Sequence, residues 1–355
     1  MSKILSGSII LLQLCLPQST FSQTATQFPA TLHFFLKNQL HFSTEDFQKI
    51  NAGKAVSKWV DAPHENEVAV TGIIYLPVSI NTFLQHLMSE QLLLESTDVM
   101  EMGIFKNPPE VSDLENLTFD AGDLKSLKKA RIGDSKVKFS ANAIKKIQSE
   151  IDWKQSEAKI KAGTLSKKIL TDYIRNYTAS GDSAMIVYRD KDYALNTAEQ
   201  FHQLVRESFL LKHYFPNFQT YLEQFNGTKI PGLDDLICWV KTDMGTRKNV
   251  ITFDHIFFYT PDTFSFAKSL IVAKQLYANH YFEASLSITA LVPPANNDSR
   301  GFYLLYLNHS QIDALQDSFF KGLIRRKIRY GIAVMVRRKL KFIRNKVAGL
   351  VAATE

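Results

Sequence analysis

The sequence predicts an α+β fold: a long-stranded antiparallel sheet with a C-terminal helix across it and a helical insertion. Three observations predict it. Residues 270–292 alternate between apolar and polar side chains, which is typical of a strand with one dry face and one wet face. Several similar runs lie on either side of this stretch, and an amphipathic helical pattern follows the last of them. The 355 residues are 45% hydrophobic and include 25 Phe and 13 Tyr, which is enough for a large core and excludes a disordered chain.

The stretch 270–292 is far longer than an ordinary strand of about 5–6 residues. We therefore expect it to bend or to carry a β-bulge, and Asn279 and His280 are the expected position. His280 also interrupts an otherwise apolar face, which is made of Leu276, Ala278, Phe282, Ala284, Leu286, Ile288 and Ala290.

The other elements alternate between helices and strands and then become a series of strands. A capping box of Ser43 and Asp46 opens one short helix, and a second box of Ser310 and Asp313 is expected to open the last helix. Residues 107–232 have mostly polar, helical spacing and no linker at either end, so we interpret them as a helical insertion packed on the sheet. The expected order is helices at 28–37 and 43–50, a strand at 67–76, a helix beginning at Ser79 or Asn81, strands at 98–105, 235–242, 249–259, 266–292 and 301–308, and a helix at 311–352.

The first 22 residues have the pattern of a secretory signal. Lys3 supplies a positive charge, residues 9–16 form a short apolar segment, and Thr20 and Ser22 are small residues before a cleavage site. The apolar segment is shorter than the roughly 20 residues that span a bilayer, and an uncleaved anchor is the alternative interpretation. We expect an exported periplasmic or secreted protein whose residues 23–355 form one domain.

The basic character of the chain is confined to its C-terminal end. Residues 318–355 carry 11 Lys and Arg against one acid, whereas the remaining residues carry 31 against 34. Apolar side chains recur every three to four positions in this segment, and cations cover its other faces, which is typical of an amphipathic helix at an anionic surface. Alternatively, the helix closes the sheet and turns its charged face to water. The cations that we expect to contact phospholipid or lipopolysaccharide are Arg325, Arg326, Arg337, Arg338 and Lys341.

The order of these elements resembles that of the START/SRPBCC superfamily, over residues 67–105 and from residue 235 onward. This resemblance implies a helix-grip fold with a cavity between the curved sheet and the last helix, which in that superfamily holds lipids or other apolar molecules. The chain is also similar to a set of uncharacterised secreted bacterial proteins, a resemblance that implies no activity. It rests on EVAVTG at Glu67, EMGIFKNPPEVSDLENL at Glu101, AKQLYANHYF at Ala273 and YLLYLNHSQIDAL at Tyr303.

Two histidines interrupt apolar faces of the predicted strands. A polar group in a helix-grip cavity can orient a ligand, because leaving it unpaired costs about 1–3 kcal/mol. We therefore predict that an apolar or amphipathic small molecule contacts His280, His255, Phe282, Tyr277 and Gln275. The alternative is that each histidine lies in the core and is satisfied by a neighbouring side chain or carbonyl group.

No motif predicts catalysis, a cofactor or a metal. Cys238 lies in a hydrophobic strand without a basic neighbour, so we interpret it as a buried core thiol. The sequence has no Gly-x-Ser-x-Gly elbow and no Gly-rich phosphate loop. His255 and His280 would lie about 30 Å apart by strand rise, and no other His, Cys, Asp or Glu cluster has ligand spacing, so we expect no metal site. Nucleic acid fits the basic segment but not an exported protein.

The leading hypothesis is a non-enzymatic exported protein that binds an apolar or amphipathic ligand near an anionic membrane surface. One alternative is a hydrolase or isomerase that uses the same cavity, with His280 beside Glu283 or Tyr277 for acid and base chemistry. A second alternative is an interaction module that docks through its basic C-terminal helix on an acidic partner.

We predict that residues 1–22 are absent from the mature protein, because the segment has the charge, length and small residues that signal peptidase requires. N-terminal sequencing of protein recovered from the cell envelope tests this. An intact Met1 would identify the segment as a retained anchor.

Overall fold

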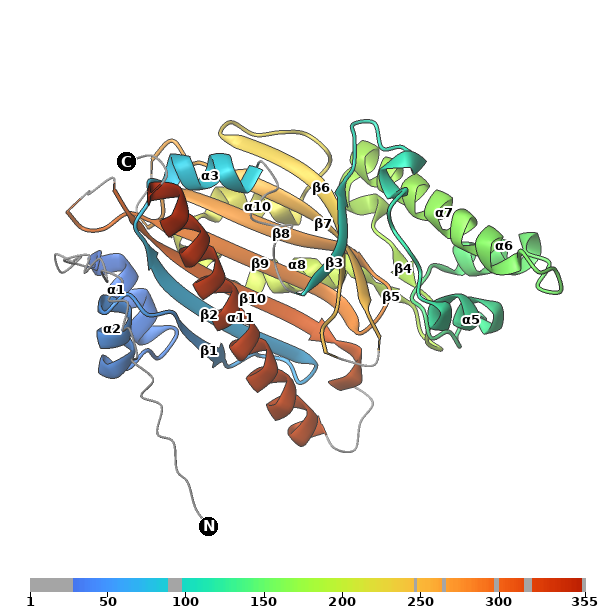
Figure 1. Cartoon of the computed structure of the whole chain (residues 1–355), viewed down its shortest axis with the longest axis horizontal. Helices are drawn as coiled ribbons and strands as arrows, with labels where there is room; N and C mark the ends of the chain where they lie inside the picture. The colour runs from blue at the N-terminus through green and yellow to red at the C-terminus, as the bar shows by residue number, and fades with distance from the viewer. Residues whose placement is uncertain are drawn as a thin grey trace, which may run out of the picture.

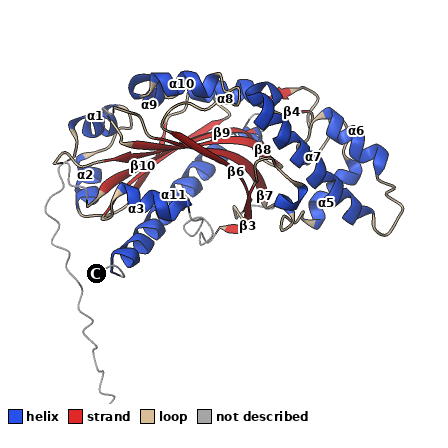
Figure 2. Cartoon of the chain, turned by 90° about the horizontal axis from the view of Figure 1, so that it is seen from above, coloured by secondary structure: helices blue, strands red, loops and turns tan. Residues whose placement is uncertain are grey.

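The structure, a computed structural model, describes residues 28–88, 98–245, 248–263, 266–296, 300–315 and 321–352. The predicted α+β class is confirmed: an eight-stranded antiparallel sheet carries helices on both faces (Figures 1 and 2). The strand order is β1-β2-β10-β9-β8-β7-β6-β3. The strands are β1 (Val56–Val60), β2 (Glu67–Leu76), β3 (Val99–Ile104), β6 (Leu233–Thr242), β7 (Val250–Tyr259), β8 (Ser269–Ala278), β9 (Phe282–Val292) and β10 (Phe302–Ile312).

Helices cover the sheet in two layers. On one face lie α3 (Ile80–Met88) and the long α11 (Lys321–Ala352), and on the other lie α8 (Thr197–Glu207), α9 (Phe209–Tyr214) and α10 (Pro216–Glu223) (Figure 2). At one end of the molecule are α1 (Ala30–Asn38) and α2 (Thr44–Asn51), and at the other are α5 (Ala121–Lys129), α6 (Ala141–Glu150) and α7 (Ala158–Ser180) (Figure 1). Shorter elements are η1 (Val111–Leu114), η2 (Gly181–Ala184), η3 (Asp313–Leu315), β4 (Val187–Tyr188) and β5 (Leu195–Asn196).

Each face of the sheet has its own hydrophobic core. The larger core lies between the sheet and the helices of the insertion. The smaller core lies between the sheet and α11, where Val70 and Ile74 of β2 pack with Val336 and Leu340. Because both faces are covered, burial along β8 does not alternate as the predicted dry and wet faces require, and Tyr277 is buried although it lies opposite the predicted dry face.

Gly72 of β2 lets α11 approach the sheet closely. A Cβ atom at this position would lie 2.6 Å from Val336 Cγ1 and 2.8 Å from Leu340 Cδ1. Both distances are shorter than carbon atoms tolerate, so a side chain here would push the helix away. The hydroxyl of Ser57 on β1 adds a hydrogen bond to Ala333 O at 2.7 Å.

On the opposite face, a buried ion pair joins the sheet to the insertion. Lys274 of β8 is fully buried, and its ammonium group contacts the carboxylate of Asp182 in η2. The same carboxylate accepts a hydrogen bond from His202 of α8 at 2.6 Å. The ammonium group also lies 4.6 Å from the ring centroid of Phe201. Burial lowers the pKa of Lys274 to about 8.

Several local predictions are confirmed. β2 has the predicted bounds of residues 67–76. The side chain of Ser43 accepts from the backbone of Asp46, and Asp46 accepts from the backbone of Ser43, which is the predicted capping box. Cys238 is buried, as predicted. The helices between β3 and β6 pack on the sheet, which fits the helical insertion of the predicted fold class.

The prediction of one strand over residues 270–292 is wrong, because the chain reverses in its middle. β8 ends at Ala278, β9 begins at Phe282, and the two strands pair antiparallel. Tyr281 has a positive φ of 62°, and the backbone N–H of Phe282 donates to His280 O at 2.7 Å, which closes a tight turn. Alternation of apolar and polar residues continues through the turn, so periodicity alone did not reveal it.

The start of the last helix also differs from the prediction. β10 runs to Ile312 and α11 begins at Lys321, so Ser310 is not a helix cap. Its hydroxyl group instead hydrogen-bonds the hydroxyl of Ser285 on the neighbouring strand at 2.8 Å. The edge strand β1 was not predicted, because five residues that include an exposed Trp59 have no clear alternation.

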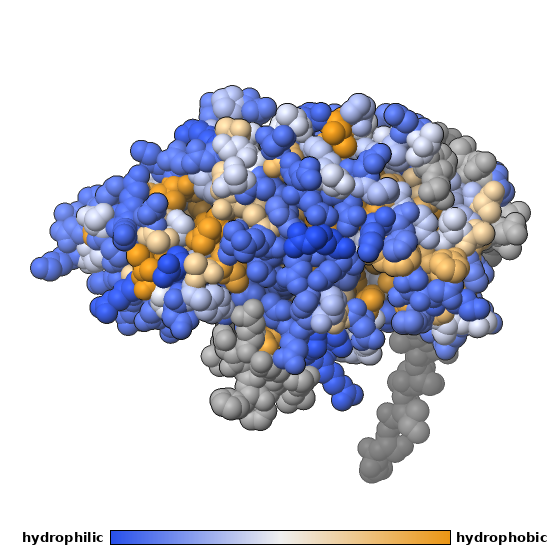
Figure 3. All heavy atoms as spheres, turned by 180° about the vertical axis from the view of Figure 1, so that it is seen from behind, coloured by the Kyte–Doolittle hydropathy of each residue, from blue (hydrophilic) through white to orange (hydrophobic). Residues whose placement is uncertain are grey.

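The predicted signal at residues 1–22 lies outside the described residues. Within the part of the chain that is described, no helix is both long and apolar enough to cross a bilayer. Seen from the side of α8–α10, the surface is mostly hydrophilic, with small apolar patches that are larger toward α5–α7 (Figure 3).

The close contact at Gly72 and the open space around Gly331 predict opposite effects for substitutions at these two glycines. Gly72→Val should lower the free energy of unfolding by about 1–3 kcal/mol, because the new methyl groups collide with α11 although valine favours strands. Gly331→Ala, inside α11 with nothing near its Cβ position, should raise it by about 1 kcal/mol. Denaturant titration of both variants is the measurement. A Gly72→Val protein as stable as the wild type would contradict the described packing.

Candidate functional site

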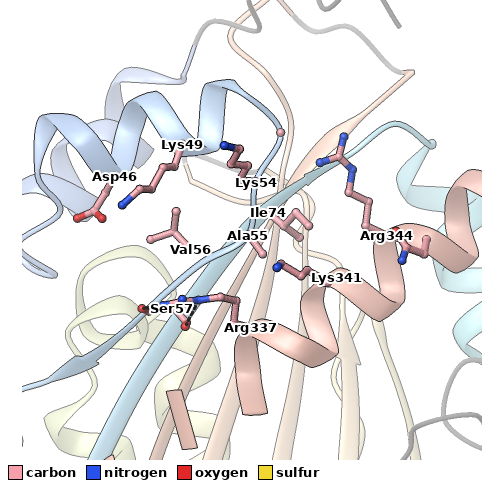
Figure 4. Close-up of a pocket in the computed structure, with 12 residues that line it drawn as sticks. Asp46, Lys49, Lys54, Ala55, Val56, Ser57, Ile74, Arg337, Lys341 and Arg344 are labelled. Atoms are coloured by element: carbon pink, nitrogen blue, oxygen red, sulfur yellow. Dashed lines mark hydrogen bonds between the residues drawn. The ribbon is translucent and has the colours of Figure 1, made fainter. Parts of the chain in front are cut away.

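A pocket of about 620 Å³ lies where α11 crosses the edge of the sheet (Figure 4). Its walls come from three segments that are far apart in the sequence: α2 with the loop after it, strands β1 and β2, and the second half of α11. This volume falls in the range of small-molecule sites. The pocket is lined by Asp46, Lys49, Gly53, Lys54, Ala55, Val56, Ser57, Ile74, Arg337, Lys341, Arg344 and Asn345.

Five cationic side chains converge on this pocket from two sides. Arg337, Lys341 and Arg344 stand at i, i+4 and i+7 in α11, so they share one face of that helix. Lys49 occupies the last turn of α2, and Lys54 follows Gly53, whose φ of 68° turns the chain from α2 toward β1. The sequence thus places cations on both walls.

The acidic residue of the pocket is already engaged. Asp46 binds Lys58 Nζ at 3.0 Å and forms the cap of α2 with Ser43. Burial alone would raise the pKa of Asp46, but the hydrogen bonds from Ser43 and Lys58 outweigh it and lower that pKa. In the described part of the chain, no acidic side chain pairs with Lys54, Lys341 or Arg344. The pocket therefore has an excess of positive charge that is open to a ligand.

The floor of the pocket is apolar. Ala55, Val56 and Ile74 line it between the two cationic walls (Figure 4). All three are buried members of the cores beneath. An arrangement of this kind favours a ligand with both an anionic group and an apolar part.

The structure divides the five predicted anion-binding cations into three groups. Arg337 and Lys341 line the pocket. Arg337 also donates to Ser57 Oγ at 3.3 Å, which holds it over β1. Arg325 donates to backbone carbonyl groups at the start of β2, at 2.5 Å for His64 O and 3.0 Å for Glu67 O. Arg326 and Arg338 are exposed elsewhere on α11.

His255 does not lie in the predicted cavity, because it is on the face of β7 that the insertion covers. Its ring is 1% exposed. Nε2 donates to Asp235 at 2.8 Å, and Nδ1 accepts from the hydroxyl of Tyr177 at 2.9 Å. Burial lowers the pKa of His255, which favours the neutral ring that this pairing requires. His255 therefore has the surroundings of the alternative interpretation, which is a core histidine whose two ring nitrogens are both hydrogen-bonded.

The placement predicted for His280 also needs correction, because it lies in the turn between β8 and β9. It is 5% exposed, and Nε2 donates to Asp123 of α5 at 2.8 Å. Of the other predicted contacts, Tyr277 is buried and donates to Lys138 O, Gln275 is buried within β8, and Phe282 packs on the core near η3. None of these residues lines the pocket.

Three cations of the pocket were missed by sequence reasoning. Arg344 continues the i, i+4, i+7 series of Arg337 and Lys341, and this spacing was a usable signal. Lys49 and Lys54 lie nearly 300 residues away in the chain. Only the fold brings them to α11, so the sequence held no local signal for them.

The chain matches no known protein family and no curated protein. Three chains of solved structures resemble it. One is the di-domain ARO/CYC StfQ from the steffimycin biosynthetic pathway, at 11% identity and a TM-score of 0.25. The match covers 57% of this chain and 62% of that one, so this chain spans less than two thirds of StfQ. A likeness of this size carries no argument about function.

We predict that His280→Ala destabilises the protein without changing ligand binding in the pocket. The substitution removes a buried hydrogen bond to Asp123 and should lower the free energy of unfolding by about 1–3 kcal/mol. Denaturant titration and a binding titration of the same variant measure the two effects. If the His280→Ala variant lost ligand binding but kept its stability, His280 would be a ligand contact after all.

Proposed function

We propose that the protein is a non-catalytic binding protein for an amphipathic anion, which it holds in the pocket between α2, β1 and α11. The observation that carries this proposal is the convergence of five cations over an apolar floor. The proposed ligand is of the amphipathic kind that we expected from the sequence. The residues proposed to contact it are cations of α2 and α11, and not the histidines.

The two parts of such a ligand match two parts of the pocket. A phosphate or carboxylate group would meet Lys54, Lys341 and Arg344, and the guanidinium fork of Arg344 suits bidentate contact with either. The apolar part would cover Val56 and Ile74. Because these two side chains are already buried, the apolar area removed from water would be mainly that of the ligand, with a gain of roughly 25 cal/mol per Å².

The proposal includes export, as the predicted signal at residues 1–22 requires. Outside the cytoplasm, the exposed Arg326 and Arg338 of the same helix would meet anionic headgroups. An amphipathic ligand partitions into membranes, so a protein that binds it gains from attraction to their surface. This attraction weakens with salt over a Debye length of about 8–10 Å.

Charge reversal in the pocket should weaken binding of a short-chain phosphatidylglycerol, which is an anionic amphiphile that dissolves as monomers. Lys341→Glu with Arg344→Glu should weaken its affinity more than tenfold, because each cation contributes about 1 kcal/mol at an anionic group. Isothermal titration measures the affinity, with a zwitterionic phosphatidylcholine of equal chain length and inorganic phosphate as comparisons. Stability should change little, since exposed charges contribute little to it.

A matched control lies on the same helix. Arg326→Glu with Arg338→Glu changes the net charge equally but leaves the pocket intact. Equal losses in both double variants would mean non-specific attraction to the helix. Undiminished binding in the pocket variant would exclude the pocket, and tighter binding of phosphate than of the lipid would exclude an amphipathic ligand.

A further inference from the structure

Three side chains with metal-binding atoms converge at the other end of β2. His64 precedes the strand, Glu67 is its first residue, and Glu207 is the last residue of α8. One ligand atom from each lies within 4.8 Å of the others. Ile74 of the pocket lies seven positions after Glu67 in β2, which is roughly 23 Å along the strand, so this cluster is separate from the pocket.

Glu67 has an unsatisfied carboxylate in this cluster. The residue is fully buried. One oxygen accepts from His309 Nδ1 at 2.5 Å, whereas Oε2 is buried without a hydrogen-bond partner among the described residues. The nearby Arg325 donates to the backbone carbonyl of Glu67 and not to its side chain. A carboxylate oxygen in this state is costly unless a cation binds it.

The ring of His64 faces two groups that it cannot satisfy together. Its Nε2 lies 2.7 Å from Glu207 Oε1 and 2.5 Å from the amide nitrogen of Gln203. One ring nitrogen either donates a proton or accepts one. If it accepts from Gln203, its lone pair points toward the lone pairs of Glu207, and the two repel each other. A cation between Nε2 and the carboxylates removes this conflict.

We propose that His64, Glu67 and Glu207 bind a divalent transition-metal ion. Two carboxylates neutralise its charge, and one imidazole with two carboxylates is a donor set that suits zinc or manganese. Three protein ligands leave at least one position for water. The carboxyl-terminal end of α8 adds the negative end of its helix dipole. His309 supports Glu67 from outside the ligand set, as residues behind metal ligands commonly do.

This ion would hold three parts of the fold together. It would join the segment before β2, the β2 and β10 region of the sheet, and the end of α8 in the insertion. His64 and Glu207 are 143 residues apart. Metal binding would therefore stabilise the attachment of the insertion to the sheet, since a ligand that binds the folded state alone stabilises it.

Zinc titration of the chelator-treated full chain tests the site. We expect one equivalent of Zn²⁺ to bind and to raise the melting temperature. Glu207→Gln should weaken Zn²⁺ affinity about tenfold or more, and His64→Gln should do the same. The half-exposed Glu207 lies at a helix end, so its variant should fold even if a change at the buried Glu67 does not. Equilibrium dialysis gives the stoichiometry, and thermal melts give the coupling to folding.

A matched control lies on α8 itself. Glu199→Gln removes the same charge from an exposed position in the first turn of that helix. It should leave Zn²⁺ affinity and the rise in melting temperature on Zn²⁺ addition unchanged. Loss of Zn²⁺ binding in Glu199→Gln as large as in Glu207→Gln would overturn the assignment. Absence of saturable Zn²⁺ and Mn²⁺ binding to the wild type would overturn the site itself.

Discussion

The insertion side of the molecule depends on the buried ammonium group of Lys274. A charge between a sheet and its helices is tolerated only with a partner, and Asp182 supplies it from η2. Because His202 of α8 binds the same carboxylate, the pair links the sheet, the end of α7 and α8 at one point. Other polar groups on this face follow the same rule: His255 pairs with Tyr177 and His280 with Asp123. These pairs specify how the insertion sits on the sheet.

The opposite face is held by close apolar packing, so the pocket lies at the periphery of the sheet. Gly72 brings α11 into contact with β2, so the space between sheet and helix that a helix-grip fold would offer is filled at its centre. Room remains at the edge, where α11 passes β1 and the side chains of Lys341 and Arg344 extend past the packed core. The cluster of His64 and Glu207 likewise lies where an insertion helix ends beside the sheet.

Local chemistry made the fold class predictable. The apolar run ended by Pro77 identified β2 to the residue, and the Ser43 capping box located α2, because both depend on residues within a few positions of one another. An irregularity at Asn279 and His280 was predicted, and the strand does break there, but the full reversal at Tyr281 was not predictable in this way. Its positive φ occurs without a glycine, and the apolar pattern runs through it, so the reversal is imposed by pairing of β8 with β9 and by the contact of His280 with Asp123.

The candidate sites were less predictable than the fold, since their residues meet only in three dimensions. Charge along α11 led us to predict an anionic partner, but the sequence alone could not show which cations bind other parts of the chain and which line the pocket. Arg325 binds backbone carbonyls, Arg337 binds Ser57 at the pocket wall, and Lys341 extends into the pocket without an acidic partner among the described residues. These cations differ in the part of the fold that lies next to their positions on the helix. Within this helix, a cation that reaches a hydrogen-bond acceptor of the protein stabilises the fold. A cation without such an acceptor leaves its charge exposed to the pocket.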